Sequence, residues 1–552
     1  MDKIVKKTLE NFDQISILEE EKGIISFSLM NKEFSIIYSD DYLMPIIAIK
    51  NEENFDYPHI MISEHKLRDG HKYRMLCLIE IDRFVKYTMS FEDKIIILLE
   101  QLIKLLSLSE PEIEKEFQKE FLFYWSYQSK NTDTIEIYAN PERQFQKMNV
   151  YINKDLRKKR IITRGIQLND KHCWNFDNSI DAYFIPIIDN RGIIPPTKGN
   201  EWSKDDIIKL IKGRDIARIS HDTFTKICAE KVKSRFVYLV FNMIVEGNDI
   251  NFCCKLSFSN GKTDTLINKI NDTISKIEII YSKRCDFYFL NKQIGNDTSI
   301  IDKNIAVIGA GSLGSYVCTE LVKSGIKNIT IYDKDELEYE NIMRHKLSYL
   351  YTLYPKVIGL KSSLKLIHPE VNIIAENEHI TETKLEEVMN NYDLIIFTVG
   401  SSDIQLLCNK MFKSKMYNKP VIYAWLEAGG ENSHILKIDY SKKGCFECLY
   451  TGEDGSLINN KANTVTDEIV ESNTIRNGCG GTRVAYGNEV LLRTTSVLLD
   501  TVKNVFNNID QDNYIIDIQP TNVVNKGNIF AERKCNCCSD KDWRTMYKDE
   551  TS

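Results

Sequence analysis

Apolar and polar positions change their period several times along the first part of the chain. Apolar residues at helical spacing over 4–12 predict a helix, and the runs IISFSLM and FSIIYS around Asn31-Lys32 predict a β-hairpin. A strand at MPIIAIK is expected next, and we interpret the polar segment YPHIMISEHKLRDGHKYRMLCL as a loop. Two helical stretches follow at 91–108 and 110–127, separated by a stop and a new start. An α+β domain is therefore predicted for residues 1–130.

The pattern becomes irregular in the middle of the chain and then strongly regular. Residues 131–290 mix strand-like runs (TIEIYA, AYFIPII, FVYLVFNMIV, KIEIIYS) with a helical stretch at 205–214, which predicts an α+β region without recognisable chemistry. Further on, NIAVIG, NITIYD, NIIAE, DLIIFTV and PVIYAW predict strands that alternate with helices. This alternation is typical of an α/β fold with a doubly wound parallel sheet. We expect it over residues 291–552, with the polar segment 451–478 as a long mobile loop.

Composition narrows the possible functions. A chain of 552 residues exceeds one hydrophobic core, which agrees with domains at 1–130, 131–290 and 291–552. The net charge of -7, with both signs mixed along the chain, predicts no nucleic-acid partner. The sequence offers no apolar run long enough for a bilayer and no signal peptide, so we expect a cytoplasmic protein without a membrane partner. In such a protein, the 14 cysteines are expected to be metal ligands, nucleophiles or buried side chains.

One glycine-rich segment has the features of a phosphate-binding loop. Gly309-Ala-Gly311-Ser-Leu-Gly314 follows a predicted strand and opens a predicted helix. Its backbone could approach phosphates, and the helix N-terminus supplies donors and positive potential. Asp333, at the end of the next strand, would bind a ribose hydroxyl. NAD and ATP both fit this pattern, so a dinucleotide-dependent oxidoreductase remains an alternative at this point.

The segment DKDELEYENIMRH, from Asp333 to His345, resembles the DxDxVxxxNLxRQ signature of the ThiF and MoeB family, the core shared by ubiquitin-activating enzymes. The resemblance implies a Rossmann-like adenylation domain that uses ATP and Mg²⁺. It also implies that Asn341 and Arg344 contact the ATP phosphates, and the fork of an arginine suits a leaving pyrophosphate.

The same family resemblance extends downstream. Pro355-Lys356-Val357, followed by HPEV, is similar to the family's "pKv…NPxv" stretch, which implies that Lys356 binds phosphate, with Lys361 as the alternative. The family's Mg²⁺-binding Asp is replaced by Gly400, and the nearest acid is Asp403.

Two pairs of cysteines have the spacing of zinc knuckles. Cys445-Phe-Glu-Cys448 and Cys535-Asn-Cys537-Cys538 are C-x-x-C motifs, in which neighbouring thiolates can bind one tetrahedral Zn²⁺. The ThiF family often carries such knuckles, which favours a structural zinc held by Cys445, Cys448, Cys535 and Cys538. Free buried thiols are the alternative, and Cys537 could replace a neighbour.

Two further cysteines are candidate nucleophiles. Cys479, in NGCGG after the long polar segment, resembles the acyl-accepting cysteine of ThiF-like enzymes, although it could be a small residue in a glycine turn. Cys77 alone would be interpreted as a core residue. Together with the order of elements and the preceding Tyr57-Pro-His59, it resembles the "PH…LC" pattern of divergent prokaryotic conjugating (UBC-like) enzymes. His59 could orient or deprotonate an attacking amine. Glu427, in AWLEAGGENSH, has no chemical role that we prefer to a structural one.

The complete architecture resembles bacterial proteins that fuse a conjugating to an activating enzyme, best known from CBASS antiphage operons. The resemblance implies that the C-terminal glycine of a donor protein is adenylated and passed to Cys479, then to Cys77, and finally to a lysine of a target protein. The implied donor is a cGAS-like nucleotidyltransferase or a ubiquitin-like protein, and the implied oligomer is a homodimer. A sulfur-carrier adenylyltransferase remains the main alternative, ahead of the NAD-dependent oxidoreductase.

Overall fold

The computed structural model describes residues 1–39, 42–50, 57–67, 69–79, 88–129, 134–153, 158–197, 200–212, 218–476, 482–509 and 512–539. It divides the chain into two compact units. The first contains residues 1–166 and 172–285, and the second contains residues 167–171 and 286–552. The three predicted domain boundaries stay a prediction.

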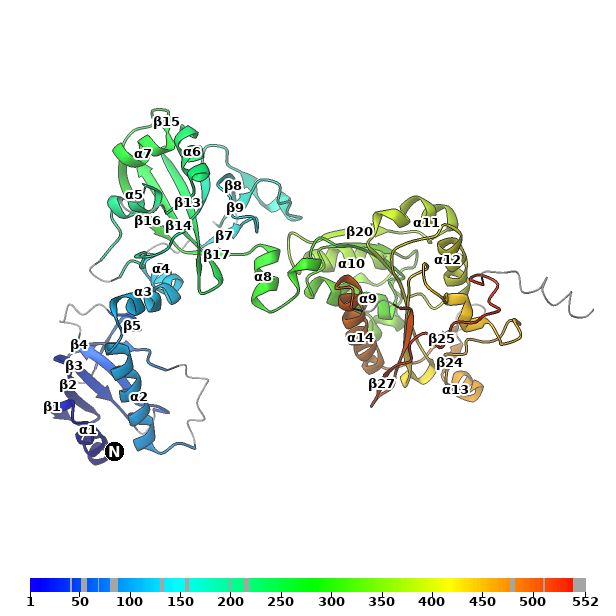
Figure 1. The fold of residues 1–552 in the computed structure, drawn as a ribbon, viewed down its shortest axis with the longest axis horizontal. Coiled ribbons are helices and arrows are strands. Elements are labelled where there is room, and N and C mark those ends of the chain that lie inside the picture. Colours follow the sequence, from blue (N-terminus) through cyan, green and yellow to red (C-terminus); the bar gives the residue numbers. More distant parts are fainter. Residues whose placement is uncertain are drawn as a thin grey trace, which may run out of the picture. The chain divides into compact units, whose positions relative to one another are not determined.

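The first unit begins with a six-stranded antiparallel sheet in its described part, with the strand order β1-β2-β3-β4-β6-β5. Helices α1 and α2 lie beside this sheet (Figure 1). Their apolar residues share its core, with Val5, Leu9, Leu99 and Leu102 fully buried. The elements are α1 (Asp2–Glu10), β1 (Ile15–Glu21), β2 (Ile24–Leu29), β3 (Lys32–Ile37), β4 (Ile46–Lys50), β5 (Ile60–Lys66), β6 (Lys72–Leu76), α2 (Phe91–Leu106), α3 (Glu110–Lys119) and α4 (Phe121–Gln128). The predicted order of helix, hairpin, strand and helices is confirmed.

The segment before Cys77 is not the predicted loop. It forms the antiparallel pair β5 and β6, with Ile60 opposite Leu76 and Lys66 opposite Lys72. Strand β5 lies at the edge of the sheet, and its end carries three exposed polar residues. An edge strand tolerates such residues because its outer edge faces water. The polar residues interrupt the apolar pattern by which a strand is predicted from sequence.

A second sheet follows, with nine strands among the described residues in the order β16-β14-β13-β11-β8-β9-β7-β17, and with β10 paired to β8. Helices α4 to α7 contribute to the apolar core on one of its faces, and a separate core covers the other. The four predicted strands and the predicted helix are confirmed as β7, β11, β13, β16 and α5. The elements are β7 (Ile135–Tyr138), β8 (Gln146–Ile152), β9 (Lys159–Thr163), β10 (Asn175–Phe176), β11 (Asp181–Pro186), α5 (Lys204–Lys212), α6 (His221–Ala229), β12 (Lys231–Val232), β13 (Phe236–Val245), β14 (Asn248–Phe258), β15 (Asp264–Thr265), α7 (Leu266–Asp272), β16 (Ile274–Ile280) and β17 (Ser282–Arg284).

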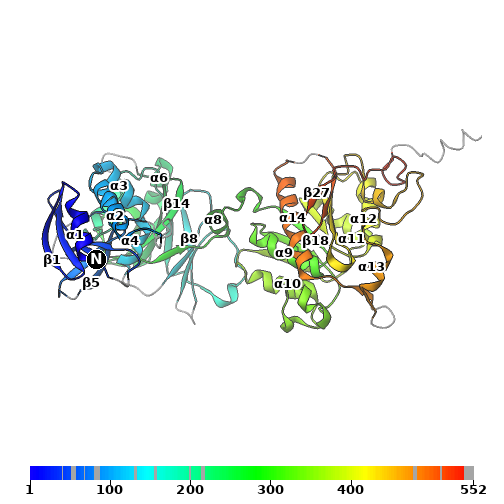
Figure 2. The same ribbon diagram turned by 90° about the horizontal axis from the view of Figure 1, so that it is seen from below.

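The second unit contains the predicted α/β doubly wound domain. Its sheet has the order β20-β19-β18-β21-β22-β23-β26-β27, parallel from β20 to β22 and antiparallel beyond. Helices α9, α10 and α14 share one core with the sheet, and α11 and α12 share the other (Figure 2). The elements are α8 (Phe287–Gln293), β18 (Asn304–Ile308), α9 (Ser312–Lys323), β19 (Asn328–Tyr332), α10 (Lys356–Lys365), β20 (Asn372–Glu376), α11 (Glu382–Val388), β21 (Leu394–Phe397), α12 (Ser402–Ser414), β22 (Val421–Leu426), β23 (Ser433–Ile438), α13 (Asp467–Ser472), β24 (Thr474–Arg476), β25 (Thr482–Val484), α14 (Asn488–Phe506), β26 (Tyr514–Ile518) and β27 (Val523–Asn525).

The polar segment predicted as a long loop contains regular structure. Residues 467–472 form α13, and β24 pairs with β25 in an antiparallel ladder. Thr466 caps α13 through a hydrogen bond from the Ile469 N–H to its hydroxyl. None of the helices in the described ranges has the length and apolar composition needed to span a bilayer.

Candidate active site

The glycine loop joins β18 to α9, and each of its glycines meets a different constraint. Gly309 has a φ of 104°, in the left-handed region that favours glycine. A Cβ on Gly314 would lie 1.9 Å from the Gly309 carbonyl oxygen, so packing excludes a side chain there. A Cβ on Gly311 would meet no atom within 4 Å, although Gly311 lines two cavities. Glycine at 311 therefore leaves space for a ligand, whereas 309 and 314 serve the loop itself.

Two side chains hold the peptide groups of this loop. Asp333 accepts a hydrogen bond from the Ala310 N–H at 2.7 Å and one from the Asp335 N–H at 2.8 Å. The Leu347 N–H donates to Nδ1 of His345, so Nε2 carries the proton and donates to the Ala310 carbonyl at 2.8 Å. Burial lowers the pKa of His345, and nearby Lys356 lowers it further, so the ring stays neutral. Ala310 is thus fixed through both its N–H and its carbonyl.

Two cavities meet at the carboxyl edge of the parallel strands. The first has a volume of about 530 Å³ and the second about 270 Å³. They share five lining residues: Gly311, Lys356, Thr398, Val399 and Gly400. Ligands of open α/β sheets bind at this edge, where strands end and the order of the sheet reverses.

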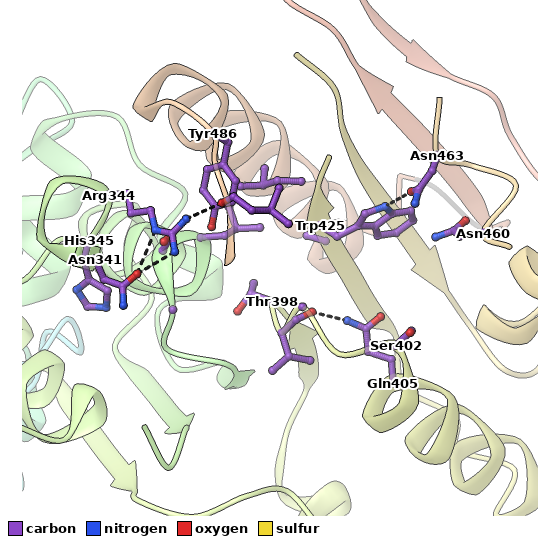
Figure 3. Close-up of a pocket in the computed structure, with 18 of the residues that line it drawn as sticks. Asn341, Arg344, His345, Thr398, Ser402, Gln405, Trp425, Asn460, Asn463 and Tyr486 are labelled. Atoms are coloured by element: carbon purple, nitrogen blue, oxygen red, sulfur yellow. Dashed lines mark hydrogen bonds between the residues drawn. The ribbon is translucent and has the colours of Figure 1, made fainter. Parts of the chain in front are cut away.

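Arg344 and Asn341 form one wall of the first cavity (Figure 3). The Asn341 side-chain oxygen accepts hydrogen bonds from Nε and one terminal nitrogen of Arg344, at 3.2 and 2.8 Å. The other terminal nitrogen donates to the Val484 carbonyl at 2.9 Å, and the guanidinium lies 4.9 Å from the centre of the Tyr486 ring. The cation is therefore held in one orientation at the cavity wall.

Lys356 adds a second cation. It is 8% exposed, lines both cavities, and its ammonium lies 3.2 Å from a carboxylate oxygen of Asp335. The alternative, Lys361, lies on the same helix and is not a lining residue of either cavity. Asp333, Asp335 and Glu378 are the acids that line the second cavity, and Asp403 lines neither. Of the two sequence candidates, Lys356 alone is thus brought next to the glycine loop.

The opposite wall of the first cavity is aromatic and amide-rich. Trp425 is the last residue but one of β22, and its indole N–H donates to the Asn463 side-chain oxygen at 2.9 Å (Figure 3). Asn460, Tyr450 and Phe446 also line this wall. Such a wall offers apolar surface and neutral hydrogen-bonding groups. These features suit an extended peptide better than they suit a charged phosphate group.

The two C-x-x-C motifs converge. The Sγ atoms of Cys445, Cys448, Cys535 and Cys538 lie within 4.8 Å of one another. The Cys445 and Cys535 sulfurs are 3.7 Å apart, and the Cys448 and Cys538 sulfurs 3.4 Å apart. A tetrahedral Zn²⁺ with bonds of about 2.3 Å places sulfurs about 3.8 Å apart, so the four cysteines fit this ion.

Asn409 supports the same cysteine cluster. Its amide N–H groups donate to the sulfur atoms of Cys445 and Cys537, at 3.6 and 3.2 Å. Its side-chain oxygen accepts from the Phe446 N–H at 2.8 Å and from the Tyr440 hydroxyl at 3.0 Å. Cys537 therefore lies beside the four-cysteine group and contacts its buried amide.

Only one of the two candidate nucleophiles lies among the described residues. Cys479 lies outside the described residues. Cys77 follows β6, is exposed, and donates its backbone N–H to the His59 carbonyl at 2.8 Å.

The His59 ring lies between two carboxylates, 3.2 Å from Glu116 and 2.9 Å from Glu120. The hydrogen bond to Glu120, together with Glu116, raises the pKa of His59 despite burial. Because both ring nitrogens face carboxylate oxygens, this geometry favours a positioning role over that of a general base.

Sequence reasoning missed His345, Thr398 and Trp425. Each had a signal: His345 directly follows Arg344 of the family signature, and Thr398 and Trp425 lie at the carboxyl ends of two strands of the parallel sheet. Because the carboxyl ends of such strands meet at one edge, both positions were candidates for a lining role.

Comparison with known proteins places the second unit in a family. Residues 292–524 match the model of the ThiF family, so this part of the chain is a ThiF-family domain, as the resemblance predicted. The "ATP-dependent ubiquitin transferase-like protein Cap2" of Pseudomonas aeruginosa (strain BWHPSA011 / Pa011) is 26% identical over 230 residues, 40% of each chain. The "Ubiquitin-like modifier-activating enzyme 5" of Caenorhabditis briggsae is 29% identical over 165 residues, 27% of this chain and 37% of that protein.

The match thus spans about two fifths of the length of these curated relatives. Among solved structures, the crystal structure of E. coli MccB with succinimide matches with 19% identity and a TM-score of 0.35, covering 44% of this chain and 67% of that chain.

Proposed function

We propose that the ThiF-family domain uses ATP to activate the C-terminal carboxylate of a donor protein, and that the chain then transfers the acyl group through cysteine thioesters. The observation that carries this proposal is the convergence of Gly311, Arg344 and Lys356 on one pair of joined cavities. The smaller cavity, which ends at Asp333, suits the nucleoside. The larger one, with its aromatic and amide wall, suits the tail of the donor.

Adenylation needs a charge arrangement that these residues supply. The donor carboxylate attacks the α-phosphorus of ATP, a new O–P bond forms, and the bond to pyrophosphate breaks. Arg344 and Lys356 neutralise the charge that develops on the leaving pyrophosphate. Mg²⁺ bound with ATP would add further neutralisation, and the carboxylate of Asp335, which lines the second cavity beside Lys356, would hold it. Because the cationic side chains are already held in place, they lower the activation barrier without having to rearrange during the reaction.

The acyl group would next pass to Cys479, whose thiolate attacks the acyl carbon as AMP leaves. Two described residues after Cys479 support this step. Val484 and Tyr486 both line the first cavity and contact the Arg344 guanidinium. The chain that follows Cys479 therefore runs along the wall where the adenylate would form.

Cys77 would take the acyl group from Cys479 and deliver it to a lysine of a target protein. The support is the order of one helix, an antiparallel sheet, an exposed cysteine and further helices, which resembles a conjugating enzyme. If both cysteines belong to one chain, the second transfer takes place at high effective concentration.

A structural zinc would be held by Cys445, Cys448, Cys535 and Cys538. Four ionised sulfurs at these distances repel one another, so a bound divalent cation would stabilise them and fix the two segments that carry them. The buried Asn409 would help to orient this site, because one of its N–H groups contacts the Cys445 sulfur and the other contacts Cys537 beside the four cysteines.

A homodimer is also part of the proposal. Six apolar side chains between β19 and α10 are more than half exposed: Tyr339, Met343, Tyr349, Leu350, Leu353 and Tyr354. The same segment supplies Asn341 and Arg344 to the active site, so a second copy covering it would also stabilise the cavity wall. Sedimentation of the wild type and of Leu350→Lys tests this; a wild type that stays monomeric at every concentration would contradict it.

The donor would be a protein that ends in glycine, either ubiquitin-like or a cGAS-like nucleotidyltransferase. The similarity to a ubiquitin transferase-like protein and to a ubiquitin-like modifier-activating enzyme supports this class. A sulfur-carrier adenylyltransferase would use the same cavities but would form no cysteine adduct.

The adenylation step is tested by pyrophosphate–ATP exchange with a glycine-ending donor. Lys356→Met should lower the exchange rate by about 10²-fold, the usual loss for one fixed group that stabilises developing charge. Lys361→Met is the matched control on the same helix and should keep the wild-type rate. Equal losses in both variants, or exchange without any donor, would contradict the proposal.

A further inference from the structure

A buried charged cluster lies behind the aromatic wall of the first cavity. His434 of β23 is 0% exposed, and its ring lies between Glu427 and Asp517. Nε2 is 2.6 Å from a Glu427 oxygen, and Nδ1 is 2.8 Å from an Asp517 oxygen. Lys526 pairs with the other oxygen of Asp517. His434, Glu427 and Asp517 are buried, and the exposed Lys526 adds a second cation from the surface, so the charges of the group balance.

The imidazole is charged in this setting. Burial pulls the pKa of His434 down, but the hydrogen bonds with Asp517 and Glu427 outweigh it and raise the pKa above its usual value. Both carboxylates in turn have lowered pKa values despite burial, because the imidazolium bonds to each. A buried ion group of this kind is costly to break by removing one member, because it leaves an unpaired charge.

Glu427 connects the cluster to a segment far along the chain, residues 460–465, which we call the strap. Its carboxylate accepts the Thr464 N–H at 2.9 Å and the Val465 N–H at 2.8 Å. It also accepts the Thr464 hydroxyl at 3.0 Å. Glu427 thus accepts hydrogen bonds from three donor groups of the strap and one from His434, and the Thr464 N–H is shared between its two oxygens.

The strap is part of the cavity wall. Asn460 and Asn463 line the first cavity, and Asn463 accepts the Trp425 indole N–H (Figure 3). The Trp425 ring stacks on His434 with 5.0 Å between ring centres. The cluster therefore contacts both halves of this wall, the strap through Glu427 and the indole through His434. The second cavity is lined by no residue of the strap or of the cluster.

We infer that the His434 cluster anchors the strap over the first cavity, so that Glu427 and His434 are positioning residues for the donor tail and not for the nucleotide. This inference rests on the proposed function, since it concerns the cavity assigned there to the donor. It gives Glu427 a defined role: its carboxylate links the strap to His434 on the central sheet by hydrogen bonds and so restricts the movement of the strap.

Hydrogen–deuterium exchange tests the anchor without any donor. In Glu427→Gln, backbone amides of 460–465 should exchange about tenfold faster or more, because charge-assisted hydrogen bonds to two amides are weakened. Glu431→Gln is the matched control, the same change at an exposed residue just before β23. It should leave the hydrogen–deuterium exchange of the strap at the wild-type rate. Thr464→Ala is a second test at an exposed residue that removes one bond to Glu427 without disturbing the core. It should speed exchange by a smaller factor.

Affinity for the ATP analogue AMPPNP with Mg²⁺, measured by calorimetry, should stay within about twofold of wild type in Glu427→Gln, since none of these residues lines the second cavity. Unchanged strap exchange in both Glu427→Gln and Thr464→Ala would overturn the inference. So would a loss of nucleotide affinity in Glu427→Gln with Glu431→Gln unaffected. A wild type that binds no AMPPNP would instead count against the proposed function, and the exchange result would still decide the anchor.

Discussion

Replacing the glycines of the phosphate loop one at a time separates folding from ligand binding. A Cβ at 314 would lie 1.9 Å from the Gly309 carbonyl oxygen and 2.7 Å from the Thr398 hydroxyl. The backbone must move to accept it, which corresponds to the upper end of overpacking costs, about 3 kcal/mol. The better helix propensity of alanine returns about 1 kcal/mol. Gly314→Ala should therefore destabilise the domain by about 2 kcal/mol and lower its Tm by roughly 4–8 °C.

Gly311→Ala should leave the stability almost unchanged and weaken ATP binding. The φ of -73° suits alanine, and no atom lies within 4 Å of the added Cβ, so stability should stay within about 1 kcal/mol of wild type. The methyl group would, however, occupy space next to both cavities, where phosphates would approach. ATP affinity should fall by about tenfold or more, comparable to the cost of an overpacked contact.

Differential scanning fluorimetry with increasing Mg-ATP measures both effects in one experiment. Wild type should gain Tm with ATP, Gly311→Ala should start at the wild-type Tm and gain much less, and Gly314→Ala should start low. Wild-type ATP stabilisation in Gly311→Ala would refute the phosphate-loop assignment.

Three other predictions concern groups outside the loop. Burial raises the pKa of Glu370 from 4.5 to about 7, so its contribution to stability is present below pH 4.5 and is lost as the pH rises through about 7. Glu370→Gln should remove this loss and stabilise the domain at pH 8 by at most about 3.5 kcal/mol, from 2.5 pH units at about 1.4 kcal/mol each; thermal unfolding from pH 5 to 8 with the same slope in both proteins would contradict it. Purified protein should contain zinc in equimolar amount by elemental analysis, and Cys445→Ser should lose most of it and lower the Tm, whereas Cys173→Ser, an exposed cysteine elsewhere, should keep it; zinc-free wild type would disprove the site. For His59, whose pKa is raised, the stabilisation is full below pH 6.5 and disappears as the pH rises through the raised pKa. Glu120→Gln should lower that pKa in an NMR titration, and an unchanged titration would contradict the carboxylate clamp.

The sequence alone predicted the parallel strands of the ThiF-family domain well, for a physical reason. These strands are buried on both faces, so they appear as short continuous apolar runs between turn signals. The glycine loop was equally visible, because its position after a strand and before a helix is local information.

The elements and contacts that could not be predicted from the sequence depend on residues far apart along the chain or on their place in the sheet. Strand β23 was missed because it contains His434 and Lys437, both buried, whose charges are satisfied by Asp517 and by the Asp512 carbonyl far along the chain. Strand β5 was missed because its polar residues face solvent at a sheet edge. In the polar segment 451–478, the contacts with Glu427 could not be foreseen from its own composition.

Only part of the candidate active site could be predicted from the sequence. Arg344 and Lys356 came from the family signature, and the structure places both beside Gly311. The aromatic wall around Trp425 and Asn463 brings residues together from separate segments, so no local motif indicates it. The roles of Cys479 and Cys77 stay predictions.

The central claim is the relay of an acyl group through two cysteines, and intact-mass analysis with non-reducing gels tests it most directly. Purified protein would be incubated with ATP, Mg²⁺ and a candidate donor protein that ends in glycine. The account predicts a thiol-sensitive adduct in wild type, no adduct in Cys479→Ala, and an adduct that remains on Cys479 in Cys77→Ala. Formation of the adenylate without a cysteine adduct in any of the three proteins would contradict the relay and leave an adenylyltransferase.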